Sequence, residues 1–204
     1  MIYTVSISAV LIGITLIFIL SNNTISTSAS QNSATPDFLT YANSTYGVKL
    51  QVPSNWDLQE VGNRLNNSTI TIIRLTPSFD IHRSFDTDPS DGSTYIDINE
   101  QKDFRNMSLD SLMKNNINII KNDKNTSDFK LMSSTTDAIL AGQKAYTLVY
   151  ASTYNGQKTI TMDSATLCGD RIYSATYSVE PLNYVEFAQT AQKMVGSLKL
   201  IMTS

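Results

Sequence analysis

One acidic segment of the sequence has the side-chain spacing of a calcium loop. Positions 1, 3, 5 and 12 of an EF-hand count supply oxygen ligands, and here they are Asp86, Asp88, Ser90 and Asp97. The match is imperfect, because Gly92 falls at position 7 instead of 6, Pro89 stiffens the turn, and Asp is shorter than the usual final Glu. Two interpretations stay open: a solvated acidic loop, which the spacing favours, and a weak site for calcium or manganese.

The sequence has one histidine and one cysteine, which limits the nucleophilic and zinc sites that it could form. His82 stands beside Arg83 in a polar stretch, which is typical of a solvated surface residue, and a triad or zinc site would need distant partners. Cys168 ends a predicted strand at a tight turn and is expected to be a small buried hydrophobe. The sequence leaves a Cys168–His82 pair open without favouring it, and no catalytic or organic-cofactor residues are predicted.

No common enzyme motif is present, and the aromatic residues admit two interpretations. The phosphate-loop, dinucleotide, nucleophile-elbow and HExxH strings are all missing. Ten tyrosines occur, several of them between residues 146 and 177. We expect them to build the core and faces of a sheet, with a platform for sugars or aromatic ligands as the alternative.

Local patterns predict strands first and a helix after them. Apolar residues alternate with polar ones from 48 to 52, where Pro53 stops the strand, and similar runs at 70–75 and 95–98 predict two more. Residues 108–122 change to a helical period, with Ser108 as the N-cap.

The second half predicts a hairpin and a closing helix. A short strand at 129–132 precedes strands at 144–153 and 158–168, which Asn155-Gly156 joins in a type I′ turn. A strand at 171–179, a helix from Pro181 to Gly196 and an extended tail at 197–201 follow. Strands mixed with two helices indicate an α+β class with an antiparallel sheet.

Four sequence pieces occur in the order found in PsbP-type domains. They are Tyr46-Gly47-Val48-Lys49-Leu50-Gln51-Val52-Pro53-Ser54-Asn55-Trp56, Ala141-Gly142-Gln143-Lys144-Ala145-Tyr146, Gly169-Asp170-Arg171-Ile172-Tyr173, and Met194-Val195-Gly196-Ser197-Leu198-Lys199-Leu200. The chain therefore resembles the PsbP-like family over about residues 38–201. Its Thr/Asn-rich, sequon-bearing composition resembles the archaeal secreted branch of that family.

The resemblance implies a fold and a kind of function. It implies an α/β/α sandwich with a central antiparallel β-sheet flanked by helices, a fold shared with a eukaryotic Ran-binding protein. It also implies accessory work without catalysis, as in the extrinsic photosystem II subunits that help to retain calcium and chloride. The long basic N-terminal segment of the plant type is missing here, which argues against docking on a photosystem.

The N-terminal segment predicts export. Residues 2–20 contain no charge, and all 15 basic and 18 acidic side chains follow Pro36. We expect residues 1–34 to be a signal peptide or membrane anchor with a polar linker, and residues 35–204 to be the folded domain. The net charge of −3 offers no basic face for nucleic acid. Six glycosylation sequons occur, at Asn22, Asn43, Asn66, Asn67, Asn106 and Asn125.

Together these features predict an exported, non-catalytic binding or accessory protein. Its expected partner is a membrane protein complex on the extracytoplasmic side, and its expected location is extracellular or on the outer face of the cytoplasmic membrane. The alternatives are a carrier of a divalent metal or small ligand, and a small extracytoplasmic hydrolase.

Overall fold

The computed structural model describes residues 37–64, 69–78, 94–102 and 107–201. These residues belong to one compact unit, which spans residues 36–204. The predicted leader, His82, three of the predicted metal ligands and four of the sequons lie outside the described residues. Those ligands are Asp86, Asp88 and Ser90, and those sequons are at Asn22, Asn66, Asn67 and Asn106.

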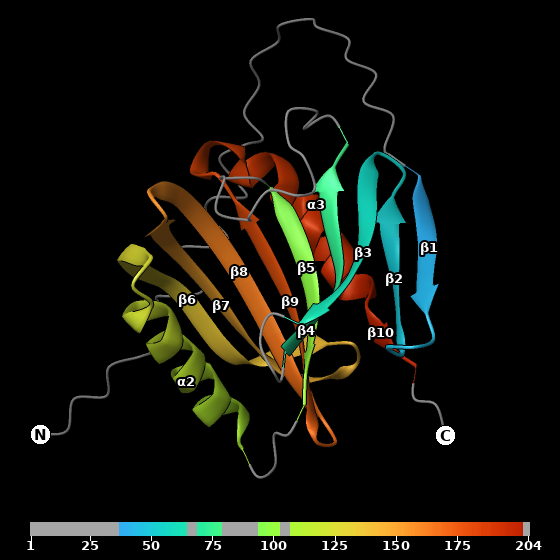
Figure 1. The fold of residues 1–204 in the computed structure, drawn as a ribbon, viewed down its shortest axis with the longest axis horizontal. Helices are drawn as coiled ribbons and strands as arrows, with labels where there is room; N and C mark the ends of the chain where they lie inside the picture. Colours follow the sequence, from blue (N-terminus) through green and yellow to red (C-terminus); the bar gives the residue numbers. More distant parts are fainter. Residues whose placement is uncertain (1–36, 65–68, 79–93, 103–106, 202–204) are drawn as a thin grey trace, which may run out of the picture. The chain divides into compact units, whose positions relative to one another are not determined.

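A seven-stranded antiparallel sheet dominates the described chain (Figure 1). Its order across the sheet is β3-β4-β5-β9-β8-β7-β6, so only the step from β5 to β9 joins strands that are not consecutive in this sheet. The bounds are β3 Trp56–Arg64, β4 Thr69–Pro77, β5 Tyr95–Gln101, β6 Thr126–Leu140, β7 Gln143–Tyr154, β8 Gln157–Cys168 and β9 Arg171–Val179.

A second, three-stranded antiparallel sheet combines the two ends of the described chain. β2 (Val48–Pro53) lies between β1 (Phe38–Asn43) and the short β10 (Lys199–Leu200). Gly47 permits this arrangement, because it has a positive φ of 63° and a Cβ there would lie 2.7 Å from the carbonyl oxygen of Ile201.

Two α-helices pack on opposite faces of the large sheet. α2 (Leu109–Asn122) buries Leu112 in a small cluster with residues of β7, β8 and β9. α3 (Tyr184–Ser197) follows a 3₁₀ turn, η4 (Pro181–Asn183), and packs mainly on β2 in the main core. Trp56 seals that core, with its ring edge-on to Phe187 of α3 at 6.1 Å. In Figure 1, α2 lies in front of the sheet and α3 behind it.

Most predicted elements are confirmed, and the differences have local causes. The Ser108 cap, the helix after it and the Asn155-Gly156 turn are as expected, with φ of 48° and 84° at the two turn residues. The strand predicted at 129–132 is part of the much longer β6. Most positions of β6 are exposed, so its full length has no clear apolar alternation in the sequence. The helix α3 continues through Gly196 to Ser197, although we expected it to end at Gly196. This glycine does not have the positive φ of a helix-terminating residue.

The fold class is therefore α+β with an antiparallel sheet, as predicted. Two strands, β1 and β3, were not predicted at all. Within the described part of the chain, no helix is both long and apolar enough to cross a membrane.

Candidate functional site: the groove beneath α2

The face of the sheet that α2 partly covers is polar because of strict alternation in β9. Ser174, Thr176 and Ser178 point to this face, while Ala175, Tyr177 and Val179 enter the main core. A strand alternates its side chains between two faces, so this series places a row of hydroxyl groups under the helix. β8 repeats the pattern with Thr159, Thr161 and Asp163.

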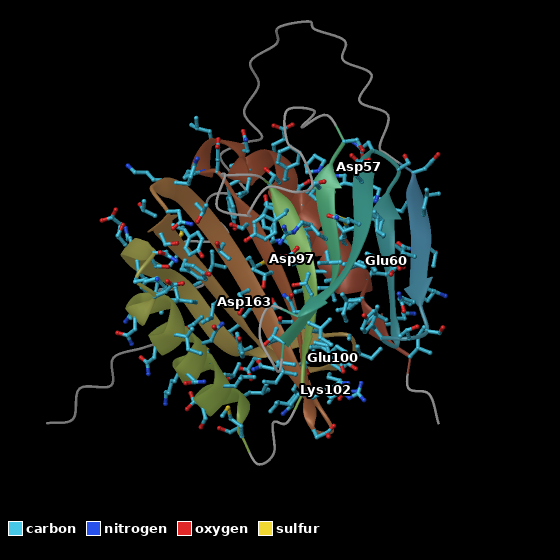
Figure 2. All side chains as sticks on the ribbon, in the orientation of Figure 1. Asp57, Glu60, Asp97, Glu100, Lys102 and Asp163 are labelled. Carbon is cyan, nitrogen blue, oxygen red and sulfur yellow. The ribbon has the colours of Figure 1, made fainter. Side chains whose placement is uncertain are left out.

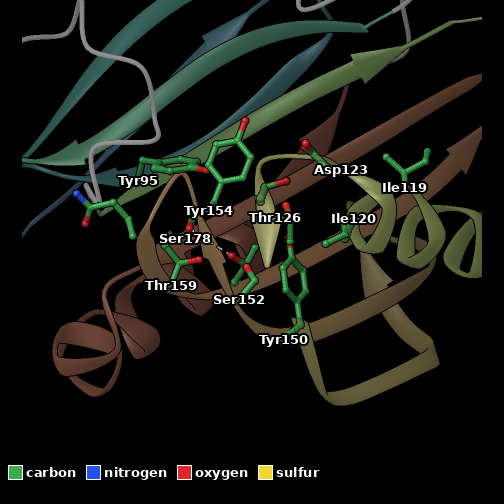
Figure 3. Close-up of a pocket in the computed structure, with 13 residues that line it drawn as sticks. Tyr95, Ile119, Ile120, Asp123, Thr126, Tyr150, Ser152, Tyr154, Thr159 and Ser178 are labelled. Atoms are coloured by element: carbon green, nitrogen blue, oxygen red, sulfur yellow. Dashed lines mark hydrogen bonds between the residues drawn. The ribbon is translucent and has the colours of Figure 1, made fainter. Parts of the chain in front are cut away.

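A groove runs between the C-terminal half of α2 and this polar face. It consists of two adjoining pockets of about 250 Å³ each, which share Ile119, Ile120, Tyr150 and Thr176. Figure 3 shows the first pocket, with Tyr95 and Tyr154 on one wall and the two isoleucines of α2 on the other. Ile119 is 60% exposed at the rim, so the groove has a partly apolar edge.

Asp163 is the polar centre of the second pocket. Its side chain is only 7% exposed and accepts three hydrogen bonds. Thr176 Oγ1 donates to Oδ1 over 2.8 Å, while Asn116 Nδ2 and Tyr146 Oη donate to Oδ2 over 2.7 and 3.0 Å. Burial raises the pKa of the Asp163 carboxyl, and the three hydrogen bonds oppose that rise.

A second carboxylate lies on the same face, two strands away. The strand register pairs Asp97 of β5 with Thr176, and Thr176 with Asp163. Arg74 of β4 binds Asp97 with two hydrogen bonds, from Nε to Oδ1 at 2.8 Å and from Nη2 to Oδ2 at 2.7 Å. Burial raises the pKa of Asp97 and the pair with Arg74 opposes this. Figure 2 labels both carboxylates, with Asp163 to the left of Asp97.

The tyrosines of the groove keep their protons at neutral pH. Burial, with a contribution from Asp97, raises the pKa of Tyr95 to about 12. Burial also raises the pKa of Tyr146 and of Tyr150, and the charge of Asp163 adds to both shifts. These phenols therefore serve as neutral hydrogen-bond donors and aromatic surfaces, not as bases.

The groove contains groups for binding but no assembled nucleophile. Thr161 and Ser178 are hydrogen-bonded to each other at 3.2 Å, and Thr176 donates to Asp163. Activating a hydroxyl nucleophile takes an adjacent base such as an imidazole or amine, and none lines the groove among the described residues. Within the same ranges, no three His, Cys, Asp or Glu side chains are placed to hold a metal ion.

The sequence-predicted site residues do not mark this groove. Of the predicted metal ligands only Asp97 is described, and it is bound by Arg74 on the sheet face next to the groove. Cys168 is a free thiol at the far end of β8, half-buried against the main core in a small pocket with Tyr46 and Arg171. Asp163 was not predicted as a site residue. The sequence signal that could have identified it is a carboxylate in the alternating series Thr159-Thr161-Asp163 of a predicted strand.

The fold is similar to several solved structures, at identities that establish the fold alone. The cyanobacterial PsbP (CyanoP) from Synechocystis sp. PCC 6803 is 11% identical, over 85% of this chain and 98% of that one, with a TM-score of 0.58. The Ran-binding protein Mog1p of Saccharomyces cerevisiae is 10% identical, over 82% and 97%, with a TM-score of 0.52. LpqN, involved in cell envelope biogenesis of Mycobacterium tuberculosis, is 10% identical, over 84% and 88%, with a TM-score of 0.52.

The sequence itself matches one family model. That model is described as PsbP-like protein and matches residues 3–200 of this chain. None of the curated proteins matches the sequence.

Proposed function

Because this chain belongs to the PsbP-like protein family, we propose that it is a non-catalytic binding or accessory protein that engages a partner protein through the groove beneath α2. The observation that carries the proposal is the composition of that groove. Hydroxyl groups, neutral phenols and a buried carboxylate line it, and no imidazole or amine base stands among its described residues. Polar groups placed in a concave site with an apolar rim are typical of recognition.

A protein partner is favoured by the shape of the groove and by one similar fold. The pockets are open at the surface, and the exposed Ile119 stands at their edge. An apolar residue at the rim of a polar groove provides area that a partner can bury. The solved yeast Mog1p is described as Ran-binding, so this fold serves protein recognition in that protein.

The proposed location is outside the cytoplasm, as an archaeal-type exported member of the family. The charge-free residues 2–20 and the concentration of all charges after Pro36 support this. The proposed partner is therefore a membrane complex on the extracytoplasmic side. Asn125 is exposed and suits glycosylation, whereas the Asn43 amide nitrogen donates to Tyr41 and Glu60.

The test is affinity capture from native membranes with the full chain as bait. Ile119→Glu places a charge at the groove rim, where a 60% exposed side chain tolerates it, and should abolish capture of the partner. Leu182→Glu is the matched control, since Leu182 is 93% exposed in η4, outside the groove. Equal capture by both variants would refute the groove as the binding surface.

A further inference from the structure

Asp163 has an unusual environment for a buried carboxylate. Buried Asp side chains are nearly always paired with a cation. In the described part of the chain, however, the three donors to Asp163 are a hydroxyl, an amide and a phenol, all neutral. Asp97, two strands away on the same face, provides the comparison, because its two hydrogen bonds come from the Arg74 guanidinium, which carries a positive charge.

Asp163 lines the groove and keeps acceptor capacity beyond its three hydrogen bonds. A carboxylate offers about four lone-pair positions, and three are used by Thr176, Asn116 and Tyr146. The side chain also forms part of the wall of the second pocket. As far as the described residues go, one acceptor position is therefore left for a donor that enters the second pocket.

The rest of the groove favours a positively charged donor. Among the described residues that line the two pockets, the charged ones are Asp123 and Asp163, and there is no Lys, Arg or His. The rings of Tyr150 and Tyr154 add negative π faces, which attract cations. This face already shows that preference at its margin, where the Arg74 guanidinium lies 5.1 Å from the ring centre of Tyr95.

The dimensions limit the size of the cation. The two adjoining pockets measure about 250 Å³ each, and Asp163 lines only the second. A ligand held at this carboxylate therefore enters a pocket below the usual range of about 300–1,000 Å³ for drug-sized ligands. Ile119 and Ile120 provide apolar contact along one side. A short alkyl chain that ends in a charged nitrogen fits this combination of small volume, apolar wall and buried carboxylate.

We propose that the groove binds an alkylammonium group, with the Asp163 carboxylate as its counter-ion and the isoleucine wall of α2 against its alkyl chain. The inference rests on the proposed function, because it names the chemistry that the same groove recognises. The group can come from a free amine or from a lysine side chain of the partner protein.

The test is calorimetric titration of the full chain with matched probes. n-Butylammonium should bind, whereas n-butanol, which has the same chain without the charge, should bind at least about tenfold more weakly. Glucose tests the rival class of hydroxyl-rich ligands. Equal or tighter binding of butanol or glucose, or no binding of any probe, would overturn the proposal.

Two variants test whether Asp163 is the residue that binds the ammonium group, one at Asp163 and one as a control. Asp163→Asn should weaken n-butylammonium binding by at least about tenfold. Asp110→Asn removes the same charge from the exposed side of α2, where Asp110 pairs with Lys114, and should leave binding unchanged. A folded Asp163→Asn protein that keeps its affinity would refute the assignment. If that variant does not fold, the comparison of butylammonium with butanol on the natural chain still decides.

A second pair of probes distinguishes the two sources of the cation. A lysine-containing tetrapeptide that binds more tightly than butylammonium, and loses its binding on acetylation of the lysine, would identify a protein partner. Equal affinity for the peptide and the free amine would identify a small amine. If no amine binds but Ile119→Glu still abolishes partner capture, this inference fails and the proposed function stands.

Discussion

At the scale of single residues, the two carboxylates on the α2 face differ in how their charge is balanced. Asp97 has a guanidinium at 2.7 Å, so its charge is neutralised locally. Asp163 has only neutral donors among the described residues, and burial is the main influence on its pKa. A carboxylate like Asp97 links two neighbouring strands through an ion pair, here β4 and β5. A carboxylate like Asp163 can accept a further hydrogen bond from a ligand.

This difference predicts a specific pH dependence of stability. The folded-state pKa of Asp163 is raised above the ordinary value of 3.8, so the folded protein binds the proton more tightly than the unfolded chain does. The stability that this group contributes is therefore present below about pH 3.8 and is lost as the pH rises through the folded pKa. The Asp163→Asn variant should not lose stability in this way as the pH rises. At low pH its free energy of unfolding should be about 1–3 kcal/mol below that of the natural chain, because its hydrogen bonds to Tyr146 and Thr176 are disturbed.

Urea unfolding of both proteins between about pH 4 and pH 7 measures the effect. The free energy of unfolding of the natural chain should exceed that of Asp163→Asn most at pH 4, and the gap should narrow towards pH 7. Asp97 is present in both proteins, so its own titration cancels in the difference. A gap that widens with rising pH would mean that the folded protein lowers the pKa of Asp163.

The predicted calcium ligands give a second residue-scale prediction. Both carboxylate oxygens of Asp97 accept hydrogen bonds from the Arg74 guanidinium, so a cation at this position would have to replace that guanidinium. We therefore expect millimolar calcium to change the melting temperature little. A saturable rise that disappears in an Asp86→Asn/Asp88→Asn double variant would establish the metal site instead.

At the scale of elements, the sequence predicted what depends on near neighbours along the chain. Residues 108–122 have one clear apolar stripe and a capping serine, and Asn155-Gly156 specifies its turn by itself. β1 and β3 have no such signal, because β3 combines Trp56 with charged and polar residues at the edge of the sheet.

The groove could not be predicted, because it depends on register between distant strands. Thr176 pairs with Asp163 across β8 and β9, and with Asp97 across β5 and β9, although 69 residues separate β5 from β9 in the sequence. Neither pairing has a local pattern in the sequence. Only the fold brings Asn116 of α2 within 2.7 Å of Asp163.

The β7–β8 hairpin carries the groove residues Tyr150, Tyr154 and Asp163, so its turn sets their register. Gly156 has a φ of 84°, and nothing lies within 4 Å of a Cβ built there. The Cβ of Gly156→Val meets no neighbour, so we expect backbone strain at this positive φ to lower the free energy of unfolding by about 1 kcal/mol or more.

Gly196→Ala is the control for that prediction. This glycine lies inside α3 without a positive φ and with open space around it, so alanine should stabilise the protein by about 0.5–1 kcal/mol. Thermal or urea unfolding of both variants measures the two shifts. If Gly156→Val melts with the natural chain, the type I′ turn is not a source of stability.

At the scale of the whole molecule, charge and apolarity are separated along the chain. Residues 36–204 form a unit with its own core, built on β2, the large sheet and α3. The first 36 residues carry no charged side chain, and the run from Ala9 to Leu20 is almost wholly apolar. This division is typical of a leader followed by an exported domain.

Expression of the full chain in an exporting host tests this division. The domain should appear outside the cytoplasmic membrane, either released or anchored, if the apolar segment is the export leader that we propose. An Ile12→Arg/Ile14→Arg variant interrupts the apolar run, since Arg strongly disfavours membrane insertion, and should retain the protein in the cytoplasm. Cell fractionation with mass determination of the N-terminus distinguishes a cleaved leader from a retained anchor. Natural protein found in the cytosol with Met1 retained would overturn the export proposal and, with it, the proposed extracytoplasmic partner and glycosylation at Asn125.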